Sequence, residues 1–246
     1  MGFEPKQILI SCEHASNRLP PELEAPTELL DLHVAWDPGA LIVAERLAAR
    51  FAAPLHQGRY SRLVVDLNRT VGNSRLIRRV SDGHRIPFNR GLRPGEIERR
   101  IERYYRPYRQ AVERGVTEIV RREGRCVHLT IHSFTPVLRG KVRGNDVGLM
   151  YDPSRRPEAD LMRELRGKLT EATGLVVWLN KPYSGTADGI QPRFREAYPA
   201  DRYVGIELEL NQKHAADTRA SIAIADAFAG ALEGLRWLKA PAALSA

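Results

Sequence analysis

The chain has 246 residues, of which 43% are hydrophobic and two are cysteines, and its formal net charge is +8. This length fits a single domain with a full core, and two cysteines are too few for a disulfide framework or a four-cysteine zinc site. No apolar run approaches the ~20 residues of a membrane helix, and the N-terminus lacks a secretory signal pattern. We therefore expect a cytoplasmic protein that forms one domain over residues 1–246 and binds no membrane.

Short apolar runs and longer helical patterns alternate along the first third of the chain. Residues 7–12 and 62–67 (RLVVDL) are predicted strands, because both contain short apolar runs. Residues 38–51 are a predicted helix, for which Asp37 is a candidate N-cap and Pro38 stands at the first position. The Gly-, Pro- and Asn-containing residues 78–94 are a predicted loop.

A highly charged helix is predicted over residues 95–124, where arginines alternate with glutamates. This spacing is typical of a solvated helix face with ion pairs four residues apart. A basic protein attracts anions, and nucleic acid is one such class. Because the arginines are interleaved with acids, we expect no nucleic-acid partner and expect the charge to attract a small acidic substrate.

The second half of the chain continues the alternation. Predicted strands cover residues 126–131, 147–151, 175–179 and 203–210, predicted helices cover 158–173 and 217–235, and a predicted Pro- and Gly-rich loop covers 181–199. Strands separated by helices predict an α/β fold, a three-layer sandwich with a mixed, largely parallel sheet. In such folds ligands bind at the carboxyl ends of the strands.

Polar side chains stand at or near the ends of four predicted strands. They are Glu13-His14, Asn68-Arg69, His132-Ser133 and the pair Glu207 and Glu209. We therefore expect these groups to meet at one edge of the sheet.

Two histidines and a carboxylate form a three-ligand site for a divalent metal, with an open position for water. His14 and His132 are the candidate histidines, and Glu13 and Asp37 are the candidate carboxylates. A histidine after a strand is more often a hydrogen-bonded or surface residue than a ligand, and Asp37 has the alternative role of helix cap. The spacing alone is weakly specific, because there is no HExxH helix and no CxxC pair.

Glu207 and Glu209 share one face of a predicted strand, because side chains alternate with period two. Two like charges on one face of an apolar strand need a cation or water nearby, which favours a site over packing. A glutamate beside a metal takes a proton from the attacking water. An arginine next to an asparagine, here Arg69 and Asn68, grips a substrate carboxylate. Arg62 and Arg69 have the alternative of pairing with Asp66 or other acids of the protein.

Several motifs carry a family resemblance. VVDLNRT, IHSF and ELNQ resemble segments of the zinc carboxypeptidases. The stretches SCEHASNRLP, HVAWDPGA, YSRLVVDLNRT, IHSFTP, NKPYSG and GIELELNQ, spread over about residues 11–212, resemble more closely the N-formylglutamate amidohydrolase family, in particular its predicted-amidohydrolase branch.

The resemblance implies a zinc-dependent hydrolase with a carboxypeptidase-like (phosphorylase/hydrolase-like) core. Its substrate would be a small acidic N-acyl amino acid, first of all N-formylglutamate. By resemblance, one Zn²⁺ is held by His14 and His132, Glu209 is the general base, and Asn68 and Arg69 clamp the substrate carboxylate. Glu207 is the alternative base. Arg62 is expected to hold the substrate or the oxyanion, and Ser133 and Tyr183 are expected near the substrate.

One position departs from the carboxypeptidase pattern. Those enzymes use His-x-x-Glu after the first strand, and here the fourth position is Asn17. The third ligand must therefore come from elsewhere, with Glu13 and Asp37 as candidates. Two alternatives stay open: a carboxypeptidase or peptidoglycan-type amidase, and a binding protein that kept the fold without the chemistry. Metal content and amide hydrolysis discriminate between them.

Overall fold

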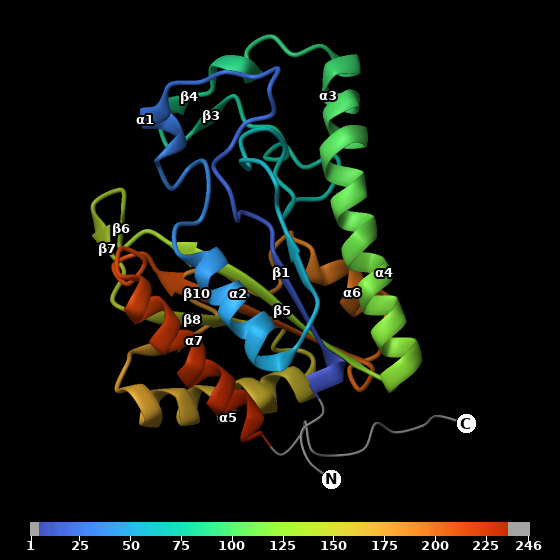
Figure 1. Ribbon diagram of the computed structural model, residues 1–246, viewed down its shortest axis with the longest axis vertical. Helices are drawn as coiled ribbons and strands as arrows, with labels where there is room; N and C mark the ends of the chain where they lie inside the picture. Colours follow the sequence, from blue (N-terminus) through green and yellow to red (C-terminus); the bar gives the residue numbers. More distant parts are fainter. Residues whose placement is uncertain (1–4, 236–246) are drawn as a thin grey trace.

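The computed structural model describes residues 5–235; residues 1–4, part of the stretch considered for a secretory signal, and residues 236–246 lie outside the described range. Its centre is a six-stranded sheet (Figure 1). Along the sheet the strands are β2 (Leu55–Gln57), β1 (Ile8–Cys12), β5 (Cys126–Phe134), β10 (Tyr203–Asn211), β8 (Val147–Met150) and β9 (Val177–Leu179). The first four are mutually parallel, and β8 pairs antiparallel with β10. The predicted mixed, largely parallel sheet is confirmed.

Helices cover both faces of this sheet. One face packs against α2 (Ala40–Phe51), α5 (Arg156–Thr173) and α7 (Thr218–Glu233), and the other against α4 (Arg106–Glu123) and α6 (Gln191–Ala197). Strand β1 shows the alternation that makes this possible, because Ile8 and Ile10 face the first layer while Leu9 faces the second. The predicted three-layer sandwich is confirmed.

A lobe stands above the carboxyl end of β1 and occupies the upper part of Figure 1. Two small hydrophobic clusters hold it together, one around Leu63 and Ile86 and one around Leu67 and Ile101. Its elements are α1 (Thr27–Leu30), the hairpin of β3 (Val80–Ser81) and β4 (His84–Arg85), the 3₁₀ turn η2 (Pro87–Asn89) and α3 (Pro94–Arg100). The lobe therefore covers the carboxyl ends of the strands, where the polar groups were expected.

The predicted strand over residues 62–67 is wrong. This segment forms consecutive turns, with hydrogen bonds from the Val64 N–H to the Ser61 carbonyl and from the Arg69 N–H to the Asp66 carbonyl. Its apolar side chains are buried in the lobe and not in the sheet. The strand that pairs with β1 at this point is the short β2, which the sequence analysis missed.

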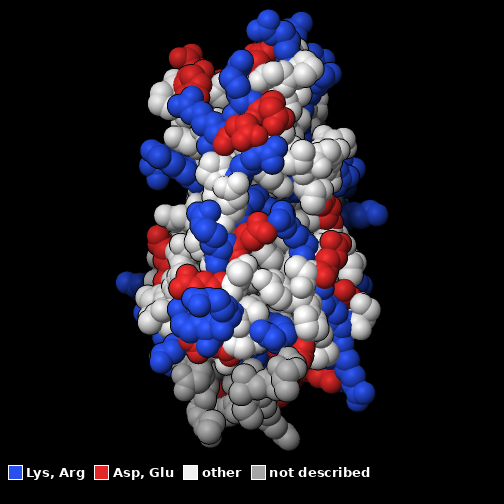
Figure 2. All heavy atoms as spheres, turned by 90° about the vertical axis from the view of Figure 1, so that its right-hand side faces the viewer, with Lys and Arg blue, Asp and Glu red and all other residues white. Residues whose placement is uncertain are grey.

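The predicted charged helix is three segments in the structure. The π-helical segment η3 (Ile101–Tyr105) separates α3 from α4, and the Arg106 N–H bonds to the Ile101 carbonyl five residues back. Pro107 follows at once and has no N–H with which to continue the regular ladder. Exposed pairs such as Arg106–Glu102 and Arg122–Glu118 bear out the predicted ion-paired face. Figure 2 shows basic and acidic side chains interspersed on this side of the molecule.

Other boundaries shift by smaller amounts. The predicted helix over residues 38–51 starts two residues later, at Ala40, with Gly39 as N-cap at φ 79°. Helix α6 lies inside the predicted loop over residues 181–199. A second hairpin, β6 (Val137–Leu138) and β7 (Lys141–Val142), and the 3₁₀ turn η1 (Pro5–Gln7) complete the described elements. Within residues 5–235, no helix combines the length and apolarity needed to cross a membrane.

Candidate active site

The carboxyl ends of three central strands supply the first polar groups of the site. His14 follows β1 directly, and His132 lies in the last third of β5. In the β5–β10 register Glu209 stands beside His132, and Glu207 stands beside Thr130. Because these neighbouring parallel strands end at the same edge, three of the four expected groups meet. The fourth, Asn68-Arg69, reaches the site from the lobe and not from a strand.

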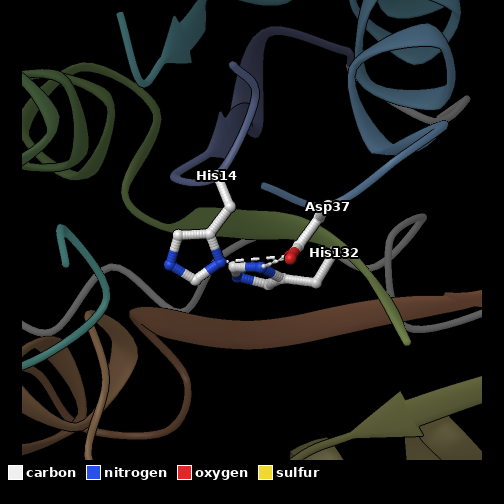
Figure 3. A group of neighbouring side chains, drawn as sticks. All are labelled: His14, Asp37 and His132. Atoms are coloured by element: carbon white, nitrogen blue, oxygen red, sulfur yellow. Dashed lines mark hydrogen bonds and ion pairs between the residues drawn. The ribbon is translucent and has the colours of Figure 1, made fainter. Parts of the chain in front are cut away.

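His14, Asp37 and His132 form a compact buried group (Figure 3). The Nδ1 atoms of His14 and His132 lie 3.1 Å and 2.8 Å from the same Asp37 oxygen, Oδ2. Asp37 sits in the turn before α2, where its N–H bonds to the His14 carbonyl. Its side chain does not cap α2, so the capping alternative is wrong: the two imidazoles hold it instead.

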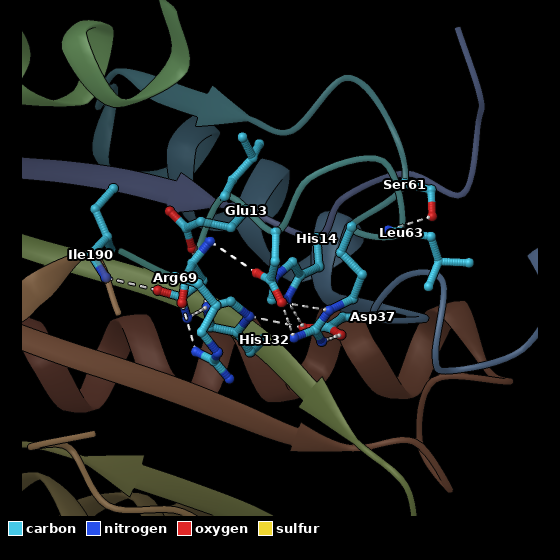
Figure 4. A network of polar contacts seen from close by, with 12 residues as sticks. Glu13, His14, Asp37, Ser61, Leu63, Arg69, His132 and Ile190 are labelled. Carbon is cyan, nitrogen blue, oxygen red and sulfur yellow. Dashed lines mark hydrogen bonds and ion pairs between the residues drawn. The ribbon is translucent and has the colours of Figure 1, made fainter. Parts of the chain in front are cut away.

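A second carboxylate faces the outer nitrogen of each histidine. His14 Nε2 lies 2.7 Å from Asp66 Oδ1, and His132 Nε2 lies 3.1 Å from Glu13 Oε2. The Tyr108 hydroxyl donates to the other Glu13 oxygen at 2.9 Å. Figure 4 shows Glu13 and Asp37 approaching His132 from different sides. Asp37 therefore contacts both histidines, whereas Glu13 contacts only one.

From the sequence, Asp66 was considered only as an acid with which Arg62 or Arg69 could pair, and not as a candidate site residue. It accepts hydrogen bonds from His14 and from the Asn68 N–H. The signal was present in the DLNR motif, in which Asp66 stands two residues before Asn68. The same carboxylate pairs with Arg62, whose Nη2 lies 2.7 Å from Asp66 Oδ2, while Arg62 Nη1 lies 3.4 Å from Asp37 Oδ1.

Burial and charge act against each other on these groups. Burial alone raises the pKa of a carboxyl group, but the neighbouring His132 lowers the pKa of Glu13 to about 2. For Asp37, burial is likewise outweighed, by His14, His132 and Arg62, so its pKa lies well below the usual range. Burial lowers the pKa of His132, but hydrogen bonds to Asp37 and Glu13 outweigh it and raise that pKa well above its ordinary value. The group is thus organised around carboxylates that stay ionised.

Glu207 and Glu209 show the opposite behaviour. Burial raises the pKa of both carboxyl groups, although the nearby His132 lowers it in part. Each also lies near other carboxylates, Glu13 in the case of Glu207 and Glu207 and Asp37 in the case of Glu209. The Glu209 Oε2 atom is buried and has no hydrogen-bond partner among residues 5–235. An unpaired carboxylate oxygen beside the His132 imidazole can take up a proton or bind a cation.

A cavity of about 700 Å³ opens between the strand ends and the lobe, and the histidines, Asp37, Glu207 and Glu209 form part of its wall. Asn68 and Arg69 line it too. The Asn68 amide nitrogen lies 3.2 Å from His132 Nε2, and its oxygen accepts from the Ile190 N–H at 2.8 Å. Arg69 donates through one nitrogen, Nη1, to the carbonyls of Asn68 and Asp188. The asparagine is thus fixed, and the arginine is anchored at one corner of its guanidinium group.

The other expected substrate contacts also lie on this cavity. Ser133 is buried, and its hydroxyl accepts from Gln212 at 3.1 Å. Tyr183 is 44% exposed at the mouth, and its hydroxyl accepts from Arg143 at 3.3 Å. Asn17, which stands in the position of the carboxypeptidase glutamate, contacts Asp31 in the lobe and is not part of the cavity wall.

Comparison with known proteins places these residues in a family context. The family model for N-formylglutamate amidohydrolases matches residues 6–216, most of the chain. Gene product Atu2144 from Agrobacterium tumefaciens is similar in structure, with a TM-score of 0.80 and 33% identity, over 92% of this chain and 88% of that one. The N-formylglutamate amidohydrolase from Ralstonia eutropha JMP134 shares the fold, with a TM-score of 0.69 and 22% identity, over 91% and 93%. No curated protein sequence matches the chain significantly.

Proposed function

Because the chain belongs to the N-formylglutamate amidohydrolase family, we propose that it hydrolyses the amide bond of a small N-formyl amino acid, with N-formylglutamate as the first candidate. One observation carries the proposal. Two imidazole nitrogens and one carboxylate oxygen converge on the wall of a cavity that also presents two buried glutamates and an anchored arginine. These are the groups that metal-assisted amide hydrolysis requires.

The donor set fits a zinc ion. Zinc bonds of 2.0–2.2 Å at tetrahedral angles separate neighbouring ligand atoms by about 3.3 Å. The distances from Asp37 Oδ2 to the two Nδ1 atoms are 2.8 and 3.1 Å, so they need to lengthen only slightly to accommodate a zinc ion. The outer nitrogens of both histidines face carboxylates, which is the arrangement that orients metal-bound imidazoles. We therefore assign His14, Asp37 and His132 as ligands, and Glu13 and Asp66 as the carboxylates that orient them.

A zinc ion held by His14, Asp37 and His132 would supply a Lewis acid that makes the attacking water more acidic. Glu209 is the residue we assign as general base, because it stands beside His132 in the sheet and has an unpaired oxygen. It takes a proton from the attacking water and returns it to the departing amide nitrogen. Glu207 lies one pleat further along β10 and shares the same face.

The remaining residues bind and orient the substrate. Arg69 uses the guanidinium nitrogens that form no hydrogen bond within residues 5–235 to hold the α-carboxylate, and Asn68 supports it from the neighbouring position. Arg62 donates to both Asp66 and Asp37, so we assign it the task of orienting these two carboxylates. Ser133 and Tyr183 line the same cavity as Glu209, which supports assigning them to the substrate-binding surface.

The decisive experiment measures metal content and formate release on the same preparation. We expect about one equivalent of zinc and release of formate from N-formylglutamate. A variant with both His14→Ala and His132→Ala should lose the metal and the activity together. A wild-type protein that binds no zinc when zinc is supplied would contradict the proposal, and a metal-loaded protein that leaves every N-formyl amino acid intact would contradict it equally.

A further inference from the structure

The cavity carries more positive charge than the proposed chemistry uses. Besides Arg62 and Arg69, it is lined by Arg75, Arg78 and Arg79, which come from one short segment of the lobe. Arg62 is neutralised by two carboxylates. Arg78 is not, because no carboxylate of residues 5–235 lies within 4 Å of its guanidinium group. Its side chain donates only a long hydrogen bond to the Ser81 hydroxyl, at 3.3 Å.

Two of the acids that line the cavity with Arg78, Asp82 and Asp188, are bound by other groups. Asp82 faces His33 and Arg139. Asp188 accepts hydrogen bonds from the Thr70 N–H and the Asn73 amide. The half-buried Arg78 guanidinium therefore has no anion of its own, although leaving a charge partly desolvated and unpaired is costly.

The groups around Arg78 also disfavour its positive charge in the absence of a bound anion. Burial lowers the pKa of Arg78, and the nearby Arg62, Arg69 and Arg75 lower it further, although Asp66 partly compensates. Arg69 likewise has no carboxylate partner within 4 Å in the part of the chain that the structure describes. Arg75 and Arg79 also lack a carboxylate partner among the described residues, but both are exposed, whereas Arg69 and Arg78 are partly buried. Two partly buried arginines without carboxylate partners match a ligand that carries two negative groups.

We propose that Arg78 binds the side-chain carboxylate of the substrate and makes the enzyme selective for acidic N-acyl amino acids. This inference rests on the proposed function, in which Arg69 holds the α-carboxylate. A guanidinium group matches a carboxylate in a planar, two-point fashion, so an amide or a thioether in the same place forfeits most of the interaction. Arg78 is then the specificity-determining residue of the cavity.

The test compares Arg78→Met with the wild type on N-formylglutamate, N-formylglutamine and N-formylmethionine. For N-formylglutamate we expect KM to rise at least ~10-fold, the range that a hydrogen bond to a charged group accounts for. For the two neutral substrates we expect KM and kcat to change by less than ~3-fold. Arg78→Lys should recover part of the preference for glutamate, because it keeps the charge and loses the planar fork.

Arg90→Met is the matched control, because it removes one positive charge from the same lobe at an exposed position away from the cavity. Its KM values should equal those of the wild type. Equal KM changes on all three substrates in Arg78→Met, or no change on N-formylglutamate, would overturn the inference.

A binding measurement separates this inference from the proposed function. If the wild type hydrolyses none of the three substrates, the proposed function has failed. Glutarate binding, measured by calorimetry, then tests the role of Arg78 independently of catalysis. Glutarate binding that weakens at least ~10-fold in Arg78→Met, and not in Arg90→Met, supports an anion site at Arg78. Equal binding by the wild type and Arg78→Met, or no binding by the wild type, overturns it.

Discussion

His14 and His132 leave different strands yet direct their Nδ1 atoms at a single oxygen of Asp37, with ring centroids 4.9 Å apart. Neither ring is free to turn, because the outer nitrogen of each meets a second carboxylate. Such a doubly fixed pair of imidazoles is the expected scaffold for a divalent metal. Asp37 lies between the two rings, whereas Asp66 and Glu13 contact them from outside.

Asp37→Asn is predicted to lose metal binding more severely than any other single carboxylate change at the site. The substitution keeps the shape of the side chain but removes the negative charge that a zinc ligand supplies. We expect zinc affinity to fall by more than the ~10–100-fold that the loss of an outer partner costs, measured by chelator competition. Asn17→Ala is the control, because Asn17 lies outside the cavity wall, and it should bind zinc as the wild type does.

Asp66→Asn is predicted to weaken zinc binding without abolishing it. Asp66 contacts His14 from the side opposite to Asp37, so its loss leaves all three assigned ligands in place. We expect zinc affinity to fall ~10–100-fold, with one equivalent still bound at saturating zinc. Glu13→Gln, which perturbs His132 in the same way, should behave alike. A complete loss of the metal in either variant would show that the carboxylate is itself a ligand.

The core strands and their polar ends were predictable because local pattern and burial agree there. Strands β1, β5 and β10 are short apolar runs, and His14, His132 and Glu209 follow from their position alone. The choice between Glu13 and Asp37 was not predictable, since the sequence does not show whether the neighbour of His14 or a carboxylate 23 residues further along reaches both imidazoles. The turn before α2 places the Asp37 carboxylate between the two imidazole rings. His14 and His132 lie 23 and 95 residues away from Asp37 in the sequence, so local sequence patterns do not reveal these contacts.

Residues 62–67 show why an apolar run is an ambiguous signal. Leu63, Val65 and Leu67 are buried as a strand would bury them, but in two clusters of the lobe. The spacing of hydrophobic residues indicates that a side chain is buried, but not which hydrophobic cluster it packs into. The turns that result bring Arg62, Asn68 and Arg69 to the cavity wall and Asp66 to His14. The mistaken strand over residues 62–67 therefore contained or adjoined residues of the site.

Glu209→Gln is predicted to abolish turnover while the metal stays bound. An amide cannot accept the proton of the attacking water, and removing a general base costs ~10²–10⁴-fold in rate. Zinc content should be unchanged, because Glu209 is not one of the three assigned ligands. Glu207→Gln is the matched control on the same strand face and should retain most of kcat. If the two variants exchange these phenotypes, Glu207 is the base.

His128 is predicted to make the fold sensitive to mild acid. It is buried between the Ser11 hydroxyl, 2.8 Å from Nε2, and the Tyr203 hydroxyl, 2.9 Å from Nδ1, and burial lowers its pKa to about 3. In the unfolded chain a histidine has a pKa of about 6.5. Between these two values the unfolded chain binds a proton that the folded chain does not, so the contribution of His128 to stability is complete above about pH 6.5 and is lost as the pH falls toward 3.

The comparison of wild type with His128→Gln isolates this contribution. At pH 7 the variant should be less stable by about 1–3 kcal/mol, because the glutamine amide replaces the two hydrogen bonds imperfectly. The gap in the free energy of unfolding should then shrink by up to about 1.4 kcal/mol for each pH unit below 6.5. Urea titrations between pH 4.5 and 8, with a chelator present so that metal binding does not contribute, measure this gap, and circular dichroism at pH 7 checks that the variant is folded. Parallel curves for the two proteins would mean that His128 takes up its proton equally well in the folded state.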